Sequence, residues 1–152
     1  MPSARAPGLF PRMDLPLAEK MRVGWSLIAA RRALFDIPLN EPELFTATPK
    51  WQAFIRDDPL RLRQVTAPFL MSSRKLDRYV RGVVRDRQGR PLRVFLASED
   101  RIIDNARTRA FVRRLAWPRR GITEYESAHH TLEFEPDPKP FFDDLARSCL
   151  LE

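Results

Sequence analysis

The sequence has a single cysteine, Cys149, and only five glycines among its 152 residues. One cysteine cannot form an intrachain disulfide, and it excludes a cysteine-rich metal site. No segment reaches the run of about 18 apolar residues that a membrane-spanning helix requires, and residues 1–14 lack the apolar stretch of a signal peptide. If Met1 is the true start, the default expectation is therefore a soluble, cytoplasmic protein without a transmembrane segment.

Several motifs that would identify a site are also missing. There is no GxSxG nucleophile elbow, no GxGxxG or GxxxxGK[ST] phosphate loop, and no HExxH or His/Cys metal spacing. None of the serines is flanked by the glycines that a tight elbow needs. The serines are Ser3, Ser26, Ser72, Ser73, Ser98, Ser127 and Ser148. We therefore expect no cofactor and no metal ion, and the chain has no recognisable nucleophile.

Charge is distributed unevenly along the chain. The net charge is +7, but residues 56–120 carry +11 and residues 121–152 carry −6. A basic segment attracts nucleic acid or an anionic surface, so a basic binding module is one hypothesis for the function. The few aromatic residues of this segment do not alternate with its basic residues in a binding pattern, and the segment has no known nucleic-acid motif. Nucleic acid is therefore not the partner that we expect.

The first half of the chain has helical patterns interrupted by prolines. After a proline-rich, irregular lead-in at residues 1–16, apolar residues spaced by three and four predict a helix from residue 17 to about 35, with one buried face. Asp58 and Pro59 are expected to cap and begin a second helix, and Pro68 to kink or break it near Thr66 and Ala67. The predicted buried face of the first helix consists of Leu17, Met21, Trp25, Ile28 and Ala29.

The pattern changes after a linker at residues 82–91. Residues 92–98 are a short apolar run, which is typical of a strand buried on both faces of a parallel sheet. A helix capped by Asp104 or Asn105 follows, then a second strand at residues 121–127 and a closing amphipathic helix that contains Phe141. This order of strand, helix, strand and helix predicts an α/β fold with parallel strands.

Two residues that can share a proton follow the two predicted strands. Asp100 lies in the turn after the first strand, and His130 lies in the loop after the second. The carboxyl ends of parallel strands meet at one edge of a sheet, where α/β proteins bind ligands, so we expect the two side chains to touch. An aspartate on one ring nitrogen of a histidine leaves the other nitrogen free to act as a general base.

Other interpretations of these residues remain open. Asp100 can also be a turn or capping residue, and His130 can be a loop histidine bonded to Glu133 or to the backbone. His129 is the less favoured candidate for the base. A metal site formed by Asp100, Asp104 and the two histidines is least favoured, because adjacent histidines seldom reach one ion.

Three stretches of the chain carry longer motifs. RVFLASEDRIIDNARTRAFVRRL (93–115) contains a strand followed by an SxDxIxD turn, and ITEYESAHHTLEFEPDPKPFFDDL (122–145) contains an HxLxxE loop. NEPELFTATPKWQAFIRDDPLRLRQVTAPFL (40–70) is similar to a helical cap. Together they resemble the C-terminal half of the α/β-hydrolase superfamily, in its lysophospholipase, monoacylglycerol-lipase and serine-aminopeptidase branch. The resemblance covers roughly residues 10–150.

The resemblance implies an α/β fold in which a helical cap precedes the last βαβα portion of the hydrolase sheet, without the N-terminal strands. It divides the chain into a lead-in (1–16), a cap (17–81) and a C-terminal core portion (82–152). It also implies that Asp100 and His130 are the acid and base of a serine-hydrolase triad whose nucleophile is absent from this chain. The implied substrates are carboxylic esters, such as lysophospholipids or acylglycerols.

The missing parts lead to further expectations. Without a nucleophile and an oxyanion hole, the chain alone should be inactive on esters. Two parallel strands make a marginal sheet in water, so we expect poor solubility, a dimer, or a complementing N-terminal half as partner. The alternatives are the basic binding module and an inactive remnant that serves as an interaction piece.

Overall fold

The computed structural model describes residues 3–5, 10–12, 15–37, 39–82 and 91–150. The expected linker at 82–91 therefore lies largely outside the described residues. In chain order the elements are β1 (Ser3–Arg5), α1 (Leu17–Ala29), β2 (Leu34–Asp36), the 3-10 helix η1 (Pro42–Leu44), α2 (Pro49–Asp57), β3 (Gln64–Thr66), α3 (Ala67–Gly82), β4 (Leu92–Ala97), α4 (Asn105–Arg114), β5 (Arg120–Tyr125), the 3-10 helix η2 (Leu132–Phe134) and α5 (Lys139–Leu150).

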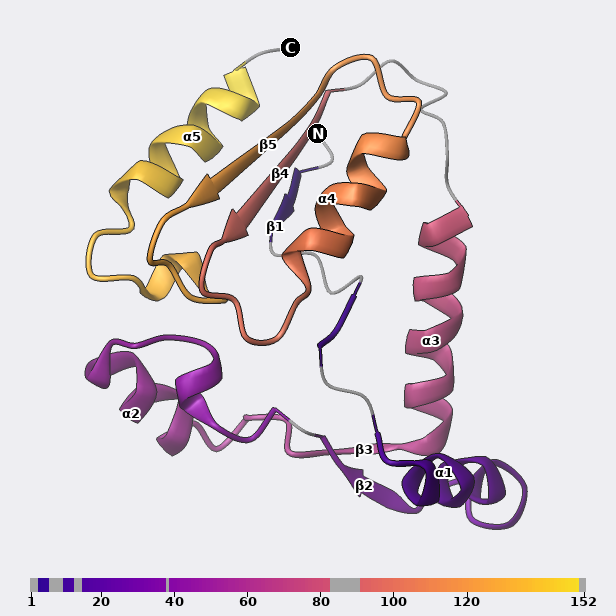
Figure 1. The fold of residues 1–152 in the computed structure, drawn as a ribbon. Helices are drawn as coiled ribbons and strands as arrows, with labels where there is room; N and C mark the ends of the chain where they lie inside the picture. The colour runs from indigo at the N-terminus through magenta and orange to yellow at the C-terminus, as the bar shows by residue number, and fades with distance from the viewer. Residues whose placement is uncertain (1–2, 6–9, 13–14, 38, 83–90, 151–152) are drawn as a thin grey trace.

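A parallel sheet of three strands, in the order β1-β4-β5, forms one half of the molecule. In the register of β4 and β5, Leu92 pairs with Arg120 and Ala97 pairs with Tyr125. The helix α4 connects these two strands, as the sequence predicted. The carboxyl ends of the strands point toward the other half of the molecule, which contains α1, α2, β2 and β3 (Figure 1).

The central strand β4 is buried on both faces, which confirms the prediction for its apolar run. Val94 and Leu96 belong to a core with residues of α4, whereas Phe95 and Ala97 belong to a core with Phe141 of α5. Successive side chains of a strand point to opposite faces, so each of these helices covers one face of the sheet. Figure 1 shows α4 and α5 on opposite sides of the strands.

The other half of the molecule is joined to the sheet by the helix α3. In this half β2 pairs with β3 in the antiparallel direction, and α1 packs beside α3. Its core contains the buried side chains of Val23, Phe35 and Ala67. Near the other end of α3, Val80 packs against the core of the sheet. Within the described ranges, none of the helices combines the length and the apolarity needed to cross a bilayer.

The expected irregular lead-in at residues 1–16 contains a strand. Ser3, Ala4 and Arg5 pair with Arg93, Val94 and Phe95 of β4. The sheet therefore has three strands rather than the two that the sequence predicted. Local composition did not reveal this strand, because a three-residue strand is stabilised by its neighbour rather than by its own pattern.

The buried face predicted for the first helix was wrong. Leu17, Met21, Trp25 and Ile28 are between 69% and 82% exposed, and Val23 and Ser26 are the buried residues of α1. The helix also ends at Ala29 rather than near residue 35. The predicted apolar residues do lie on one face of α1, but α3 and β2 pack against the neighbouring face, which contains Val23.

The start predicted for the second helix was also wrong. Asp58 is the C-cap of α2 and not an N-cap, and its carboxylate accepts a hydrogen bond from the N–H of Leu60 in a turn. The helix that follows begins at Ala67, with Pro68 in its first turn, so the predicted break near Thr66 and Ala67 is confirmed as a helix start. Proline is tolerated there because first-turn N–H groups have no partner within the helix.

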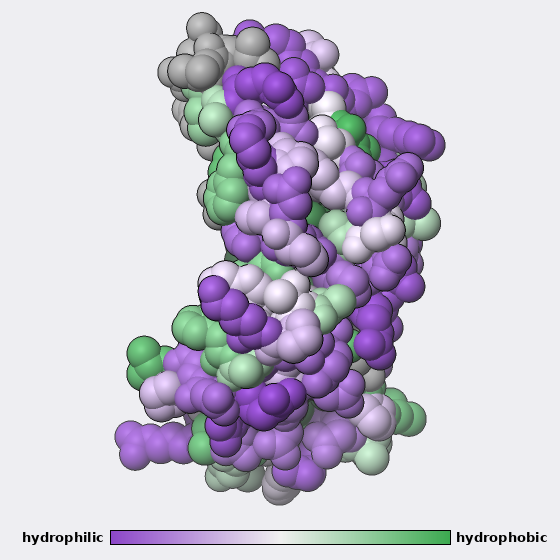
Figure 2. Space-filling view, turned by 90° about the vertical axis from the view of Figure 1, so that its left-hand side faces the viewer, coloured by the Kyte–Doolittle hydropathy of each residue, from purple (hydrophilic) through white to green (hydrophobic). Residues whose placement is uncertain are grey.

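One side of the molecule is mainly polar. Figure 2, which looks from the left-hand side of Figure 1, shows hydrophilic residues over most of this surface and an outline that narrows at mid-height. The half with the sheet and the half with α1, α2, β2 and β3 lie above and below this narrowing. A small apolar core of Leu44, Ile102 and Ile103 joins the two halves next to the carboxyl edge of the sheet.

Candidate functional site

The turns after β4 and β5 are hydrogen-bonded to each other. The N–H of Ser98 donates to the carbonyl of Tyr125 at 3.0 Å, and the N–H of Glu99 donates to the carbonyl of Ala128 at 2.9 Å. Ser127 has a φ of 55°, which places it in the left-handed region that the turn after β5 requires. These bonds fix the two loops that carry Asp100 and His130 relative to each other.

Asp100 is buried at the base of this junction, with a side chain that is only 1% exposed. Its Oδ1 accepts hydrogen bonds from the N–H groups of Ile102 and Ile103, both at 2.8 Å. Its Oδ2 lies 2.9 Å from Nδ1 of His130. The carboxylate is thus held by its own turn at one oxygen and faces the imidazole with the other.

The pKa of Asp100 is lowered. Burial alone would raise it, but the hydrogen bond with His130, the N–H donors of Ile103 and Ile102, and the charge of His130 together outweigh burial. The group is therefore ionised at neutral pH. An ionised carboxylate can only accept a hydrogen bond, so neutral His130 must carry its proton on Nδ1, and Nε2 has a free lone pair.

The lead-in of the chain is hydrogen-bonded to the turn that contains Asp100. The N–H of Arg12 donates to the carbonyl of Ile102 at 2.8 Å, and the N–H of Asp104 donates to the carbonyl of Phe10 at 2.8 Å. The Nε of Arg12 also donates to the carbonyl of Ile103 at 2.9 Å. Residues that lie 90 to 94 positions earlier in the sequence than their partners therefore hold the turn that positions Asp100.

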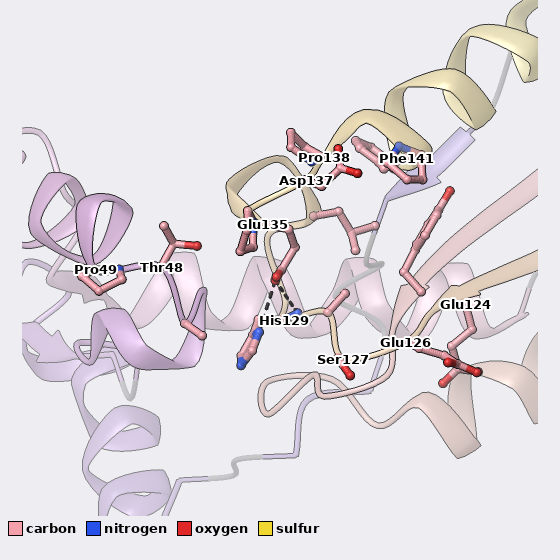
Figure 3. Close-up of a pocket in the computed structure, with 16 residues that line it drawn as sticks. Thr48, Pro49, Glu124, Glu126, Ser127, His129, Glu135, Asp137, Pro138 and Phe141 are labelled. Atoms are coloured by element: carbon pink, nitrogen blue, oxygen red, sulfur yellow. Dashed lines mark hydrogen bonds and ion pairs between the residues drawn. The ribbon is translucent and has the colours of Figure 1, made fainter.

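His129 is one of the residues that line a pocket of about 660 Å³. Its ring Nδ1 and its backbone N–H lie 3.2 Å and 2.6 Å from Oε1 of Glu135. Figure 3 shows both contacts as dashed lines from the carboxylate of Glu135 to His129. His130 does not line this pocket, so the two adjacent histidines lie in different environments.

The metal alternative finds no support in the geometry. Asp104 caps α4, since its carboxylate accepts a hydrogen bond from the N–H of Arg107 at 2.9 Å, as the sequence predicted. In the part of the chain that the structure describes, no three His, Cys, Asp or Glu side chains gather so that they could hold a metal ion.

The sequence correctly predicted the contact between Asp100 and His130, but it did not identify the residues that hold them in place. Arg12 and Phe10 come from a segment distant in sequence, so no local pattern identified their contacts. Glu135 did have a signal, since it is the last residue of the HxLxxE motif, but its role as acceptor for His129 required the loop conformation.

Comparisons with known proteins agree with this architecture. The family model described as serine aminopeptidase, S33, matches residues 6–137. A search of curated proteins finds no match. Among solved structures, the monoacylglycerol lipase of Paleococcus ferrophilus is 18% identical, with a TM-score of 0.81 over 97% of this chain and 57% of that one. A soluble variant of monoglyceride lipase from Saccharomyces cerevisiae, in complex with a substrate analogue, is 16% identical, with a TM-score of 0.72 over 96% of this chain and 54% of that one.

The two structural matches describe the fold only, because their sequence identity is low. The chain spans a little more than half the length of each of these lipases. The family match extends over most of the chain, from the lead-in through the loop of His130. The chain therefore belongs to the serine aminopeptidase S33 family, and its structure is part of an α/β-hydrolase fold.

Proposed function

We propose that this chain is the cap and C-terminal portion of a serine hydrolase, in which Asp100 and His130 are the acid and the base of a catalytic triad. The observation that carries the proposal is the 2.9 Å contact between Oδ2 of Asp100 and Nδ1 of His130 at the carboxyl edge of two parallel strands. A buried, ionised aspartate on Nδ1 gives the tautomer in which Nε2 can accept a proton.

The proposed reaction is acyl transfer through a serine. Nε2 of His130 takes the proton of the serine hydroxyl as its oxygen bonds to the ester carbonyl carbon, and then gives that proton to the leaving alcohol. Water attacks the acyl-enzyme in the second half of the reaction, again with His130 as base. Asp100 stays ionised throughout and stabilises the imidazolium.

The nucleophile of the proposed reaction lies outside this chain. No serine of the sequence has an elbow motif, and no serine hydroxyl is hydrogen-bonded to His130 among the described residues. The strand β1 is an edge of the described sheet, where a further parallel strand can pair. A complementing N-terminal portion is accordingly the partner that we propose, and a dimer is the alternative.

The substrate class that we propose is the carboxylic ester of a lipid, such as a lysophospholipid or an acylglycerol. Its support is the family match and the likeness to two lipases that act on monoacylglycerols. The division into a lead-in that contains β1 (1–16), a cap (17–81) and a core portion (82–152), and a cytoplasmic location, belong to the same proposal.

The first experiment assays the 152-residue chain with a short-chain nitrophenyl ester beside its Asp100→Ala and His130→Ala variants. The expected result is turnover no faster than buffer for all three proteins, because the groups that supply most of the rate are elsewhere. Clear turnover that both substitutions abolish would contradict an external nucleophile.

The second experiment extends the chain. The nucleotides upstream of Met1 are read for an in-frame GxSxG about 100 residues before the cap, and the longer product is assayed. The proposal expects ester hydrolysis by this product, with kcat lowered about 10³- to 10⁴-fold by Asp100→Ala or His130→Ala. An active longer product that is unaffected by either substitution would refute the roles of both residues.

A further inference from the structure

Phe45, which follows η1 in the cap, contacts the loop of His130 in two ways. Its carbonyl accepts a hydrogen bond from the N–H of Thr131 at 2.9 Å. Its ring meets the imidazole of His130 edge to face, with 5.9 Å between the ring centroids and 76° between the planes. We propose that Phe45 is a positioning residue for His130, through which the cap fixes the orientation of the imidazole on Asp100. This inference rests on the proposed function, in which His130 is the base.

The hydrogen bond to Asp100 alone does not fix the imidazole ring. One contact at Nδ1 leaves the ring free to tilt about the line between the two groups, and the side chain of His130 is 20% exposed. A second contact on the face or edge of the ring removes this freedom. Phe45 supplies that contact in the edge-to-face arrangement that aromatic pairs prefer.

Phe45 is itself firmly held. It packs against the core of Leu44, Ile102 and Ile103, and the last two residues of this core also donate to Oδ1 of Asp100. The cap segment that contains Phe45 thus touches the turn of the acid and the loop of the base together. A residue fixed against both partners can set their relative orientation.

The chain beyond Phe45 strengthens this anchor. The hydroxyls of Thr46 and Thr48 both donate to the carbonyl of Phe134, at 3.1 Å and 2.9 Å. The ring of Trp51 stacks on Phe134 with 4.5 Å between centroids. The cap segment is therefore bonded to the loop of His130 at Thr131 and at Phe134, and Phe45 is the residue whose ring contacts the imidazole.

The test reads the tautomer of His130 by NMR of the ring nitrogens in the ¹⁵N-labelled 152-residue chain. The chain has two histidines, so the His130→Gln variant assigns the signals of His130. Spectra are recorded well above the ordinary histidine pKa of about 6.5, where the neutral tautomers can be distinguished. We expect the Nδ1–H tautomer in the unaltered protein.

The Asp100→Asn variant provides the reference for a lost acceptor. The N–H groups of Ile102 and Ile103 will hold the amide oxygen at the position of Oδ1, which leaves the amide NH₂ facing Nδ1. An NH₂ donor on Nδ1 requires the Nε2–H tautomer of His130. If the unaltered protein already has the Nε2–H tautomer, Asp100 does not accept a hydrogen bond from His130. This result would refute the proposed function as well.

The Phe45→Ala variant tests the inference. We expect the ratio of Nδ1–H to Nε2–H tautomers of His130 to fall about 2- to 10-fold, the range that an aromatic pair supports. Phe69→Ala, at a 53% exposed phenylalanine of α3, is the matched control and should leave the ratio unchanged. Phe45→Leu keeps apolar bulk on Ile102 and Ile103 but lacks the ring, so it serves if the alanine variant fails to fold.

The outcomes separate the two proposals. A lower ratio in a folded Phe45 variant, with Phe69→Ala unchanged, supports the positioning role. A folded Phe45→Ala or Phe45→Leu protein with the unaltered ratio overturns this role, even where the unaltered protein has the Nδ1–H tautomer that the proposed function needs.

Discussion

The hydroxyl of Thr46 donates to the backbone carbonyl of Phe134, 88 positions later in the chain, from a side chain without solvent exposure. The hydroxyl oxygen of Thr46 also accepts a hydrogen bond from the N–H of Thr48 at 3.1 Å. One buried hydroxyl therefore satisfies the N–H donor of Thr48 and the carbonyl acceptor of Phe134, the last residue of η2. A buried polar group with both functions used is costly to remove.

Replacing this hydroxyl should weaken the joint between the two halves. We predict that Thr46→Val lowers the free energy of unfolding by about 1–3 kcal/mol, because the N–H of Thr48 loses its acceptor while the shape of the side chain is kept. Urea denaturation measures the change. Thr131→Val is the matched control, and a loss of equal size in both variants would contradict the prediction.

The buried and exposed faces of α1 give a second prediction. Polar substitutions on the exposed stripe, such as Met21→Gln or Trp25→Gln, should change the free energy of unfolding by less than about 0.5 kcal/mol. Val23→Ala, on the buried face, should cost about 1–3 kcal/mol. Denaturant titrations of the three variants decide between the two faces, since a buried stripe would reverse this order.

Glu135 gives a third prediction, because it holds the loop just before His130. Its side chain is 13% exposed, and its Oε1 accepts the N–H of His129. Glu135→Ala should cost about 1–3 kcal/mol, whereas Glu135→Gln, which keeps an oxygen acceptor, should cost less. The two unfolding curves are compared with that of Glu126→Ala, an exposed glutamate that lines the same pocket. Equal losses for the alanine and glutamine variants would show that the acceptor is not what matters.

The lowered pKa of Asp100 gives a fourth prediction, for the pH dependence of stability. A carboxyl whose pKa is lower in the folded protein contributes stability above its ordinary pKa of 3.8, and this contribution disappears as the pH falls through the lowered value. The difference in unfolding free energy between the unaltered protein and Asp100→Asn should therefore narrow below about pH 4. Denaturation at a series of pH values from 6 to 2 tests this, and parallel curves would contradict it.

The strands β4 and β5 and the turns that follow them were predictable because their signals are local. The apolar run of β4 is buried on both faces, and Asp100 follows directly after it in a turn closed by its own carboxylate. Parallel pairing with β5 then brings His130 to the same edge. Each step needs only the residues of one strand and its following loop, so the sequence was sufficient.

The half of the molecule that contains α1 and β2 was less predictable, because which helix faces are buried depends on the elements that pack against them. The stripe of α1 has helical spacing, yet it is exposed, and Phe35 of β2 packs beside Val23 instead. Periodicity identifies an apolar face but not the element that contacts it. The same limit applies to Phe45, because its contact with His130 results from packing between segments that are 85 residues apart.

The hydrogen bonds between the lead-in and the turn of Asp100 have a consequence for the order of folding. The carbonyl of Phe10 and the N–H of Arg12 bond to Asp104 and Ile102 across some 90 residues, and His130 comes later still. Closing so long a loop is slow compared with forming a helix or a turn. During synthesis, the Asp100–His130 pair can form only after residue 130 has left the ribosome, so a nascent chain that stops before this residue has the turn of Asp100 but not the pair.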